Sequence, residues 1–356
     1  MTEPEEKLAR LRALLGERYD VVVLRSSAAV AWLTGGGRSY VATNTATGVA
    51  AVIVGAGEVE VVTAANETDR LREEELGGLD ARWEVVPWNV DLTSELPRGP
   101  RVATDVGYAG VAEIDLTSVR VPLLAAETER YRSLGRDAAE ALTAACRLLS
   151  PQLSEYAAAA RVAAELVARE ADPVVLLVAG DERRATRRHP LPTAAPLGRL
   201  ASITVCARRD GLIANLSRLV AFTPPPVAEN ERYRALQTVE AAYLRASTVG
   251  ATWSRAFLAG TRAYAAAGFD ADEWTRHHQG GPTGYEPRDF LADENASGLL
   301  VAGQALAWNP TAAGLKVEDT MLVHHDGLEV LTSDGQWPST SVGAGGPLRP
   351  QILLLD

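Results

Sequence analysis

The sequence is poor in lysine and in cysteine. Its only lysines are Lys7 and Lys316, so arginine carries the rest of the basic charge. Two cysteines, Cys146 and Cys206, are too few for a disulfide framework and fit a reducing compartment. Both lie in apolar segments, so we expect small core side chains at these positions.

Long apolar runs and an excess of positive charge are also missing. No apolar run is long enough to span a bilayer, and the first ten residues lack the apolar core of a signal peptide. The formal net charge of −11 disfavours nucleic acid and anionic membranes as partners. We therefore expect a cytoplasmic protein that binds a small molecule, without nucleic-acid or membrane partners.

The 356 residues are enough for two domains, and 47% of them are hydrophobic. Residues 1–125 alternate between helical and extended patterns, which predicts a small α/β domain. The expected helices are 4–18 and 66–76, the second with Asn66 as a candidate N-cap, and the expected strands include 20–24, 49–55 and 59–65.

Residues 126–356 form the second predicted domain. A long amphipathic helix from Glu127 to Ser150 opens it, and Asp210-Gly211 predicts a β-hairpin turn. The remaining expected helices are 154–169, 229–246 and 253–267, and the expected strands include 173–180, 200–208, 212–222, 304–308 and 316–324.

The segment 274–290 is the strongest candidate for a functional site. It contains the adjacent pair His277 and His278, followed by a glycine-rich stretch at 280–284 that we expect to be a turn. Polar residues gathered in such a turn are more often functional than structural.

Four segments occur in the order and approximate spacing of a known family. They are RRHPLPT at 187–193, RRDGLIANLSRLVAF at 208–222, WTRHHQGGPTGYEPRDF at 274–290 and GQALAWNPTAAGLKVEDTMLV at 303–323. Together they resemble the pita-bread fold enzymes, which include methionine aminopeptidases, prolidases, Xaa-Pro aminopeptidases and creatinase. The resemblance implies an α/β chain in which a small N-terminal α/β domain precedes a C-terminal pita-bread α+β domain.

The resemblance also marks where the peptidases of the family hold two metal ions. The five ligand positions are matched by Thr204, Asn215, Gly281, Asn309 and Glu318. Divalent cations need anionic oxygens or imidazole, and four of these residues offer neither. We therefore expect no metal and no other cofactor at these positions, as in creatinase, the metal-free hydrolase of the family.

The histidines keep positions that carry function in the family. His189 resembles the proton-transfer histidine of creatinase, and the other interpretation is a surface histidine after Arg187 and Arg188. His277 resembles a histidine that lines the substrate entry of the proline-specific peptidases. His278 has no family counterpart, so lining the substrate site and supporting His277 remain equally open.

Three charged residues have two interpretations each. Lys316 and Glu318 share one face of an expected strand, which fits a salt bridge. The resemblance alternatively makes Glu318 an anchor for a cationic or N–H-rich substrate group. Arg288 suits either a substrate carboxylate or an ion pair with Asp289.

Neutral side chains complete the predicted substrate site. Asn215 and Asn309 are expected at its floor, where amides both donate and accept hydrogen bonds. Tyr285 follows the glycine-rich stretch and is included with them.

The sequence therefore favours a metal-independent, creatinase-like hydrolase or a related C–N bond enzyme. Its substrate would be a small amide, amidine or guanidino compound, and the resemblance implies a homodimer. One alternative is a catalytically inactive pita-bread binding protein. A second is an Xaa-Pro aminopeptidase-like metallopeptidase with unusual ligands, drawn from His277, His278 and Glu318.

Overall fold

The computed structural model describes residues 2–16, 18–343 and 346–355 and divides the chain into two compact units. The first unit contains Met1–Glu127 with Asp210–Leu212, and the second contains Thr128–Arg209 with Ile213–Asp356. That the chain divides between residues 125 and 126 into two independently folding domains stays a prediction.

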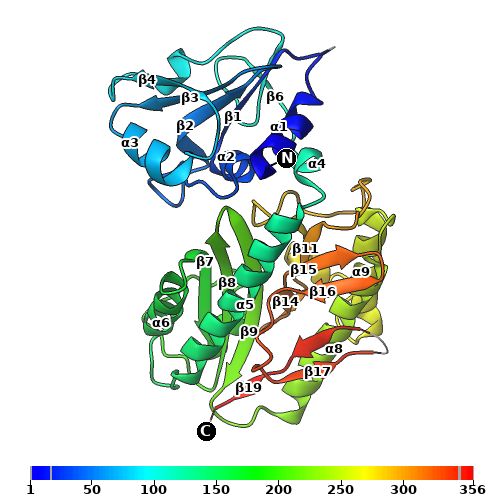
Figure 1. Ribbon diagram of the computed structural model, residues 1–356. Helices are drawn as coiled ribbons and strands as arrows, with labels where there is room; N and C mark the ends of the chain where they lie inside the picture. Colours follow the sequence, from blue (N-terminus) through cyan, green and yellow to red (C-terminus); the bar gives the residue numbers. More distant parts are fainter. Residues whose placement is uncertain (1, 17, 344–345, 356) are drawn as a thin grey trace. The chain divides into compact units, whose positions relative to one another are not determined.

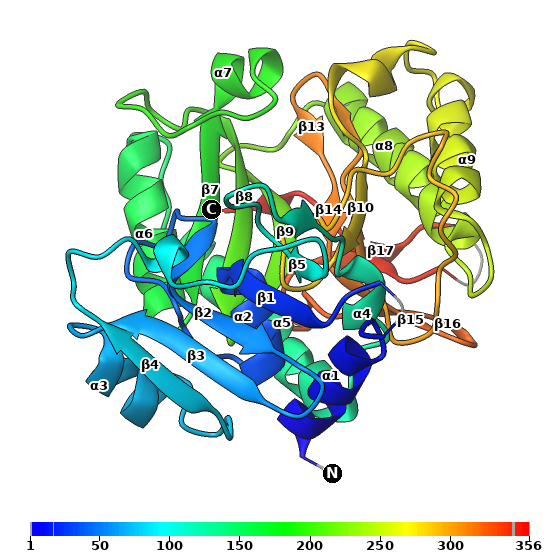
Figure 2. The same ribbon diagram turned by 90° about the horizontal axis from the view of Figure 1, so that it is seen from above.

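A six-stranded sheet in the order β4-β3-β2-β1-β5-β6 forms the N-terminal unit (Figures 1 and 2). Strands β2 and β3 make the antiparallel hairpin that the sequence predicts. Val23, Ala51 and Val62 of three neighbouring strands belong to its core. The strands are β1 Val21–Ser26, β2 Thr47–Val54, β3 Val59–Ala64, β4 Arg82–Val86, β5 Val102–Thr104 and β6 Ala112–Glu113.

The helices of this unit differ in part from the sequence prediction. Helix α1 spans Glu3–Arg12, with a capping box between Thr2 and Glu5, and ends before residue 18. The predicted helix at 66–76 is divided into α3 (Thr68–Arg70) and the π-helical turn η1 (Leu71–Glu75). Asn66 does not cap it, because Glu67 holds the N-cap position without a side-chain hydrogen bond.

Helix α2, which the sequence analysis does not predict, spans Ser27–Thr34. The Ser26 side chain accepts a hydrogen bond from the Ala29 N–H, and Gly35 ends the helix at φ 76°. Two shorter helices complete the unit, η2 at Leu92–Ser94 and α4 at Thr117–Arg120.

Two main sheets form the C-terminal unit (Figure 1). The five-stranded sheet runs β14-β9-β8-β7, with β19 beside β9, and the four-stranded sheet runs β10-β11-β15-β16. The strands are β7 Asp172–Gly180, β8 Leu200–Arg209, β9 Leu212–Ala221, β10 Gly280–Thr283, β11 Ala305–Trp308, β12 Thr311–Ala312, β13 Leu315–Lys316, β14 Glu318–Asp319, β15 Met321–His324, β16 Gly327–Val330, β17 Ser339–Ser341, β18 Leu348–Pro350 and β19 Leu353–Leu354.

Helices cover both sheets of this unit. In Figure 1, α5 and α6 lie along the sheet of β7 and β8, and α8 and α9 lie beside the sheet of β11 and β15. Among the described residues, no helix is long and apolar enough to cross a bilayer. The helices are α5 Ala125–Arg147, α6 Glu155–Val167, α7 Asp181–Thr186, α8 Val227–Ala246, α9 Trp253–Ala266 and η3 Glu273–Arg276.

The predicted glycine turn is wrong, because Gly280–Thr283 is strand β10. It pairs with β11 in antiparallel register, Gly280 opposite Trp308. Gly280 has φ 110°, and a Cβ there would lie 2.1 Å from the Ala307 carbonyl oxygen. The glycines at 280 and 281 therefore allow two strands to approach closely and do not mark a chain reversal.

Candidate active site

The C-terminal unit contains a cavity of about 430 Å³ beside the five-stranded sheet. Val175 and Leu177 of β7 and Leu291 supply apolar lining, and Thr204 and Cys206 of β8 complete this part. Cys206 was expected as a core residue, and it is buried but also reaches the cavity. Burial raises the pKa of its thiol to about 12, so it is no ready nucleophile.

Six of the nine predicted site residues line this cavity: His189, His278, Arg288, Asn309, Lys316 and Glu318. They come from segments up to 129 positions apart, which strands β10 to β14 and the loop after α7 bring together. Within the described chain, Asn215, His277 and Tyr285 lie outside the lining.

All three residues are buried. Asn215 is fully buried, and its side-chain amide donates to the Thr283 hydroxyl at 3.0 Å. Tyr285 is 3% exposed. The partner Thr283 was missed by sequence reasoning, because it stood inside a segment expected to be a turn.

Glu318 is the most strongly held group of the site. One carboxylate oxygen accepts from Arg288 at 2.7 Å, and the other from Ser217 at 2.8 Å and from Lys316 at 3.0 Å. Burial alone would raise the pKa of Glu318, but Lys316 and Arg288 lower it to about 2. Glu318 is therefore ionised at neutral pH.

The contacts of Lys316 and Arg288 bear on both interpretations of these residues. The salt bridge between Lys316 and Glu318 is present. Arg288 forms its ion pair with Glu318, 30 positions away in the chain, and lines the cavity as well.

Strand pairing explains why Glu318 faces the cavity. Glu318 lies opposite Ser217 in the antiparallel pair of β14 and β9. Because neighbours along a strand point to opposite faces, Asp319 and Arg218 face away and bind each other at 2.9 Å. Arg218 therefore does not share the face of Asn215 and Ser217.

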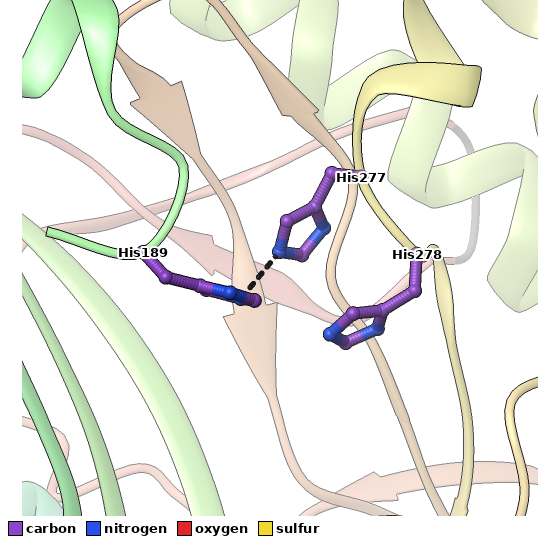
Figure 3. Close-up of side chains that lie close together, drawn as sticks. All are labelled: His189, His277 and His278. Carbon is purple, nitrogen blue, oxygen red and sulfur yellow. Dashed lines mark hydrogen bonds between the residues drawn. The ribbon is translucent and has the colours of Figure 1, made fainter.

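Three histidines converge beside the cavity (Figure 3). The Nε2 atoms of His189 and His277 are 2.9 Å apart, and the rings of His277 and His278 stack with centroids 4.3 Å apart. His189 is exposed, His278 is half-buried and His277 is buried. His189 and His277 are 88 positions apart in the sequence, which shows no sign of this contact.

All three imidazoles are neutral at pH 7. Burial, followed by the charge of Lys316, lowers the pKa of His189 and brings that of His277 to about 2. Burial, followed by the charge of Arg288, lowers the pKa of His278 to about 4. A neutral imidazole has one lone pair, which can take a proton or a metal ion, and in one ring of the His189–His277 pair it accepts the hydrogen bond between them.

Gln279 fixes the backbone that carries this pair of histidines. Its side-chain N–H groups donate to the carbonyls of His277 at 2.6 Å and Trp274 at 2.9 Å. Its oxygen accepts from the hydroxyls of Tyr243 at 3.1 Å and Tyr264 at 2.9 Å. Sequence reasoning missed this residue, since a polar residue beside two histidines carries no distinguishing signal.

The five positions matched to family metal ligands do not fit a pair of ions. Thr204 shares a hydrogen bond with Ser217 at 2.8 Å, and Glu318 is neutralised by protein cations. A Cβ at Gly281 would lie 2.4 Å from the Phe290 carbonyl oxygen, so a ligand side chain cannot be placed there. Asn215 and Asn309 are neutral amides, which offer no anionic oxygen.

The comparisons with known proteins agree with this architecture. The model of metallopeptidase family M24 matches residues 129–325. Prolidase from Pyrococcus horikoshii OT3 is similar in structure, with TM-score 0.79 and 15% identity over 92% of this chain and 98% of that one. Dipeptidase PepE from Mycobacterium ulcerans has TM-score 0.76 and 19% identity over 99% and 98%.

A third structural neighbour is not named as a peptidase. The N-terminal domain of FACT complex subunit SPT16 from Cicer arietinum has TM-score 0.68 and 13% identity over 94% of this chain and 97% of that one. No sequence match is found among curated proteins. At these identities, the structural likeness establishes the fold and not the activity.

Proposed function

We propose that this chain, which belongs to metallopeptidase family M24, hydrolyses a C–N bond of a small molecule without the metal pair of the family peptidases. Membership of the family supports the general class of activity, a peptidase-like hydrolase. Glu318 supports the more specific proposal that no metal pair is used. This residue is matched to a metal ligand of the family, and its two oxygens are held by Arg288, Ser217 and Lys316.

The charges around the cavity support a substrate with a carboxylate. Arg288 and Lys316 contribute two positive charges against one negative charge on Glu318, which leaves a net charge of +1. The Arg288 Nε is buried without a hydrogen-bond partner in the described chain. A bidentate substrate carboxylate would satisfy it.

The scissile group is an amide, amidine or guanidino group, and Asn309 supports this choice. Asn309 lines the cavity, and its side-chain oxygen is buried with no hydrogen-bond partner among the described residues. A substrate N–H would supply the missing donor, because an unsatisfied buried acceptor costs about 1–3 kcal/mol.

His189 is the proposed proton-transfer group. It would take a proton from a water molecule as the water oxygen bonds to the substrate carbon. The C–N bond then breaks, and His189 returns the proton to the leaving nitrogen, so that one water molecule is consumed. His277, 2.9 Å away, orients the imidazole, and His278 borders the bound substrate.

The test is a screen of small amide, amidine and guanidino compounds, each with and without a carboxylate. The protein is stripped with chelator, and release of amine, ammonia or urea is measured. We expect turnover of a carboxylate-bearing compound that His189→Ala abolishes and that His325→Ala, at an exposed hairpin position, leaves intact. Turnover that appears only after Mn²⁺, Co²⁺ or Zn²⁺ is added would instead support the metallopeptidase alternative.

A binding protein without activity is the second candidate. The exchange of four ligand positions for neutral residues favours it, since binding needs no reactive water. Compounds that raise the thermal midpoint without any turnover would identify this outcome, because a ligand stabilises the folded state by mass action. The homodimer and the cytoplasmic location remain predictions from the sequence and the family resemblance.

A further inference from the structure

We propose that His189, His277 and His278 form a binding site for one transition-metal ion, such as Zn²⁺, at a place different from the metal positions of the family. One ligand atom from each residue can be chosen so that all three lie within 4.8 Å of one another. None of these residues matches a family ligand. The inference does not rest on the proposed reaction, because metal binding requires no turnover.

The spacing of the histidines suits a single ion. Tetrahedral coordination at Zn–N distances of about 2.0–2.1 Å places nitrogens about 3.3 Å apart. The Nε2 atoms of His189 and His277 are already 2.9 Å apart, and the widest separation in the group is 4.8 Å. Small rotations of the imidazoles, which point toward one another in Figure 3, would therefore bring three nitrogens to one ion. Since His189 and His278 line the cavity, the fourth position would face it.

Unpartnered nitrogens are a second, independent observation. His277 is 8% exposed, and its Nδ1 has no hydrogen-bond partner in the described parts of the chain. The Nδ1 of His278 is likewise buried and unpartnered. Burying such groups costs free energy unless something binds them. An ion could supply the missing partner of the His278 Nδ1, whereas an ion held by the Nε2 of His277 leaves the Nδ1 of that ring unpartnered. The lowered pKa values agree with neutral rings, the form that a metal requires.

The surroundings limit how tightly the ion binds. Lys316 and Arg288 face the histidines and repel a cation, and Glu318 offsets one of these charges. Gln279 holds the His277 backbone through its carbonyl at 2.6 Å, which orders one ligand in advance. We therefore expect a site for a borderline ion that prefers imidazole, and little affinity for Mg²⁺ or Ca²⁺, which prefer oxygen.

The experiment is a titration of chelator-stripped, tag-free protein with Co²⁺, followed by its visible absorption bands, and then displacement by Zn²⁺. We expect one equivalent of Co²⁺ with the intense bands of tetrahedral coordination. His277→Ala and His278→Ala should each weaken binding by more than about tenfold. The chain offers a matched control in its other adjacent pair, so the double variant His324→Ala with His325→Ala should bind as tightly as the wild type.

Two outcomes would overturn the proposal: no stoichiometric Co²⁺ binding, or binding that the His324 and His325 double variant removes. A fold check by circular dichroism on each variant excludes loss by unfolding. The result is separable from the proposed function, because binding is read by absorption. If both proposals hold, Zn²⁺ occupies the lone pair of His189 and reduces turnover, and chelator restores it.

Discussion

At the residue scale, Glu318 illustrates what a buried carboxylate requires of its neighbours. A buried carboxylate is costly without a partner, and here Arg288 and Lys316 take the place of a cation. The side chains of these two partners are 9% and 11% exposed, so the pairs lie largely out of water. The network is therefore sensitive to the loss of any one member.

Glu318→Gln should lower the free energy of unfolding by about 3 kcal/mol, because it leaves two cations facing a neutral amide. The double variant with Lys316→Gln removes one of these cations and should recover part of the loss. Urea unfolding of the three proteins measures both effects. Equal stability of Glu318→Gln and the wild type would show that water already screens the pairs.

The site residues also show which features of the cavity can be predicted from the sequence. His189, His278, Arg288, Asn309, Lys316 and Glu318 were found as cavity residues because the motif order placed them on known segments. The contact of His189 with His277 could not be predicted, because no pattern in either segment indicates that residues 88 positions apart are neighbours in the fold. Proximity in sequence suggested Asp289 as the partner of Arg288, where the fold supplies Glu318.

At the scale of elements, local signals with a direct physical cause were the reliable ones. Asp210-Gly211 gave the β8–β9 hairpin, since both residues adopt positive φ, 52° and 76°. At Gly280 and Gly281 the glycines led to a wrong prediction of a turn. They lie in a tightly packed strand, and a glycine-rich strand cannot be distinguished from a turn by its composition. Propensity alone cannot distinguish these two uses of glycine.

Arg349 joins three elements of the C-terminal unit. From β18 it donates to Glu240 of α8 at 2.6 Å and pairs with Asp319 of β14 at 2.8 Å, and it is 1% exposed. Arg349→Met should cost about 3–5 kcal/mol, since it leaves the buried Glu240 carboxylate unpaired and removes one of the two cations that bind Asp319. Urea unfolding measures the loss, and Arg147→Met, at an exposed position of α5, is the control that should change little.

Glu329 of β16 gives a pH dependence for the contact with α5. A hydrogen bond from Arg132 of α5 lowers the pKa of Glu329 below its usual value near 4.5, despite opposing burial. A lowered folded-state pKa adds stability that is complete above the unfolded pKa and is lost as the pH falls through the folded one. Stability should therefore decline below about pH 4.5, and Glu329→Gln should make this decline smaller. An unchanged pH profile in that variant would remove Glu329 as a cause.

At the scale of the whole molecule, the two units have separate cores. One core includes Val23, Ala51 and Val62 of the N-terminal sheet, and the other includes Leu236, Trp253 and Trp308 of the C-terminal unit. Alternation of helices and strands in the sequence predicted the N-terminal α/β unit, and the family resemblance implied the class of the C-terminal unit. Sequence patterns do not report how strongly the two cores are coupled, because coupling depends on packing between distant segments.

The scarcity of lysine makes this coupling measurable. Lys7 lies in the N-terminal unit and Lys316 in the C-terminal unit, and both are buried. Lys7 is held by Glu127 at 2.9 Å and by the Trp32 carbonyl at 2.6 Å. A lysine-specific protease therefore has one target in each unit, and each target becomes accessible when its surroundings unfold.

We expect brief proteolysis across a urea series to cut after Lys7 at lower urea than after Lys316, with mass spectrometry identifying each product. The smaller unit buries a smaller fraction of its surface on folding and should unfold first. Both sites should be cut in fully denatured protein, which confirms that the protease tolerates each sequence. Coincident cleavage at both lysines would mean that the units unfold as one, and the boundary predicted near residue 125 would then not separate independently folding domains.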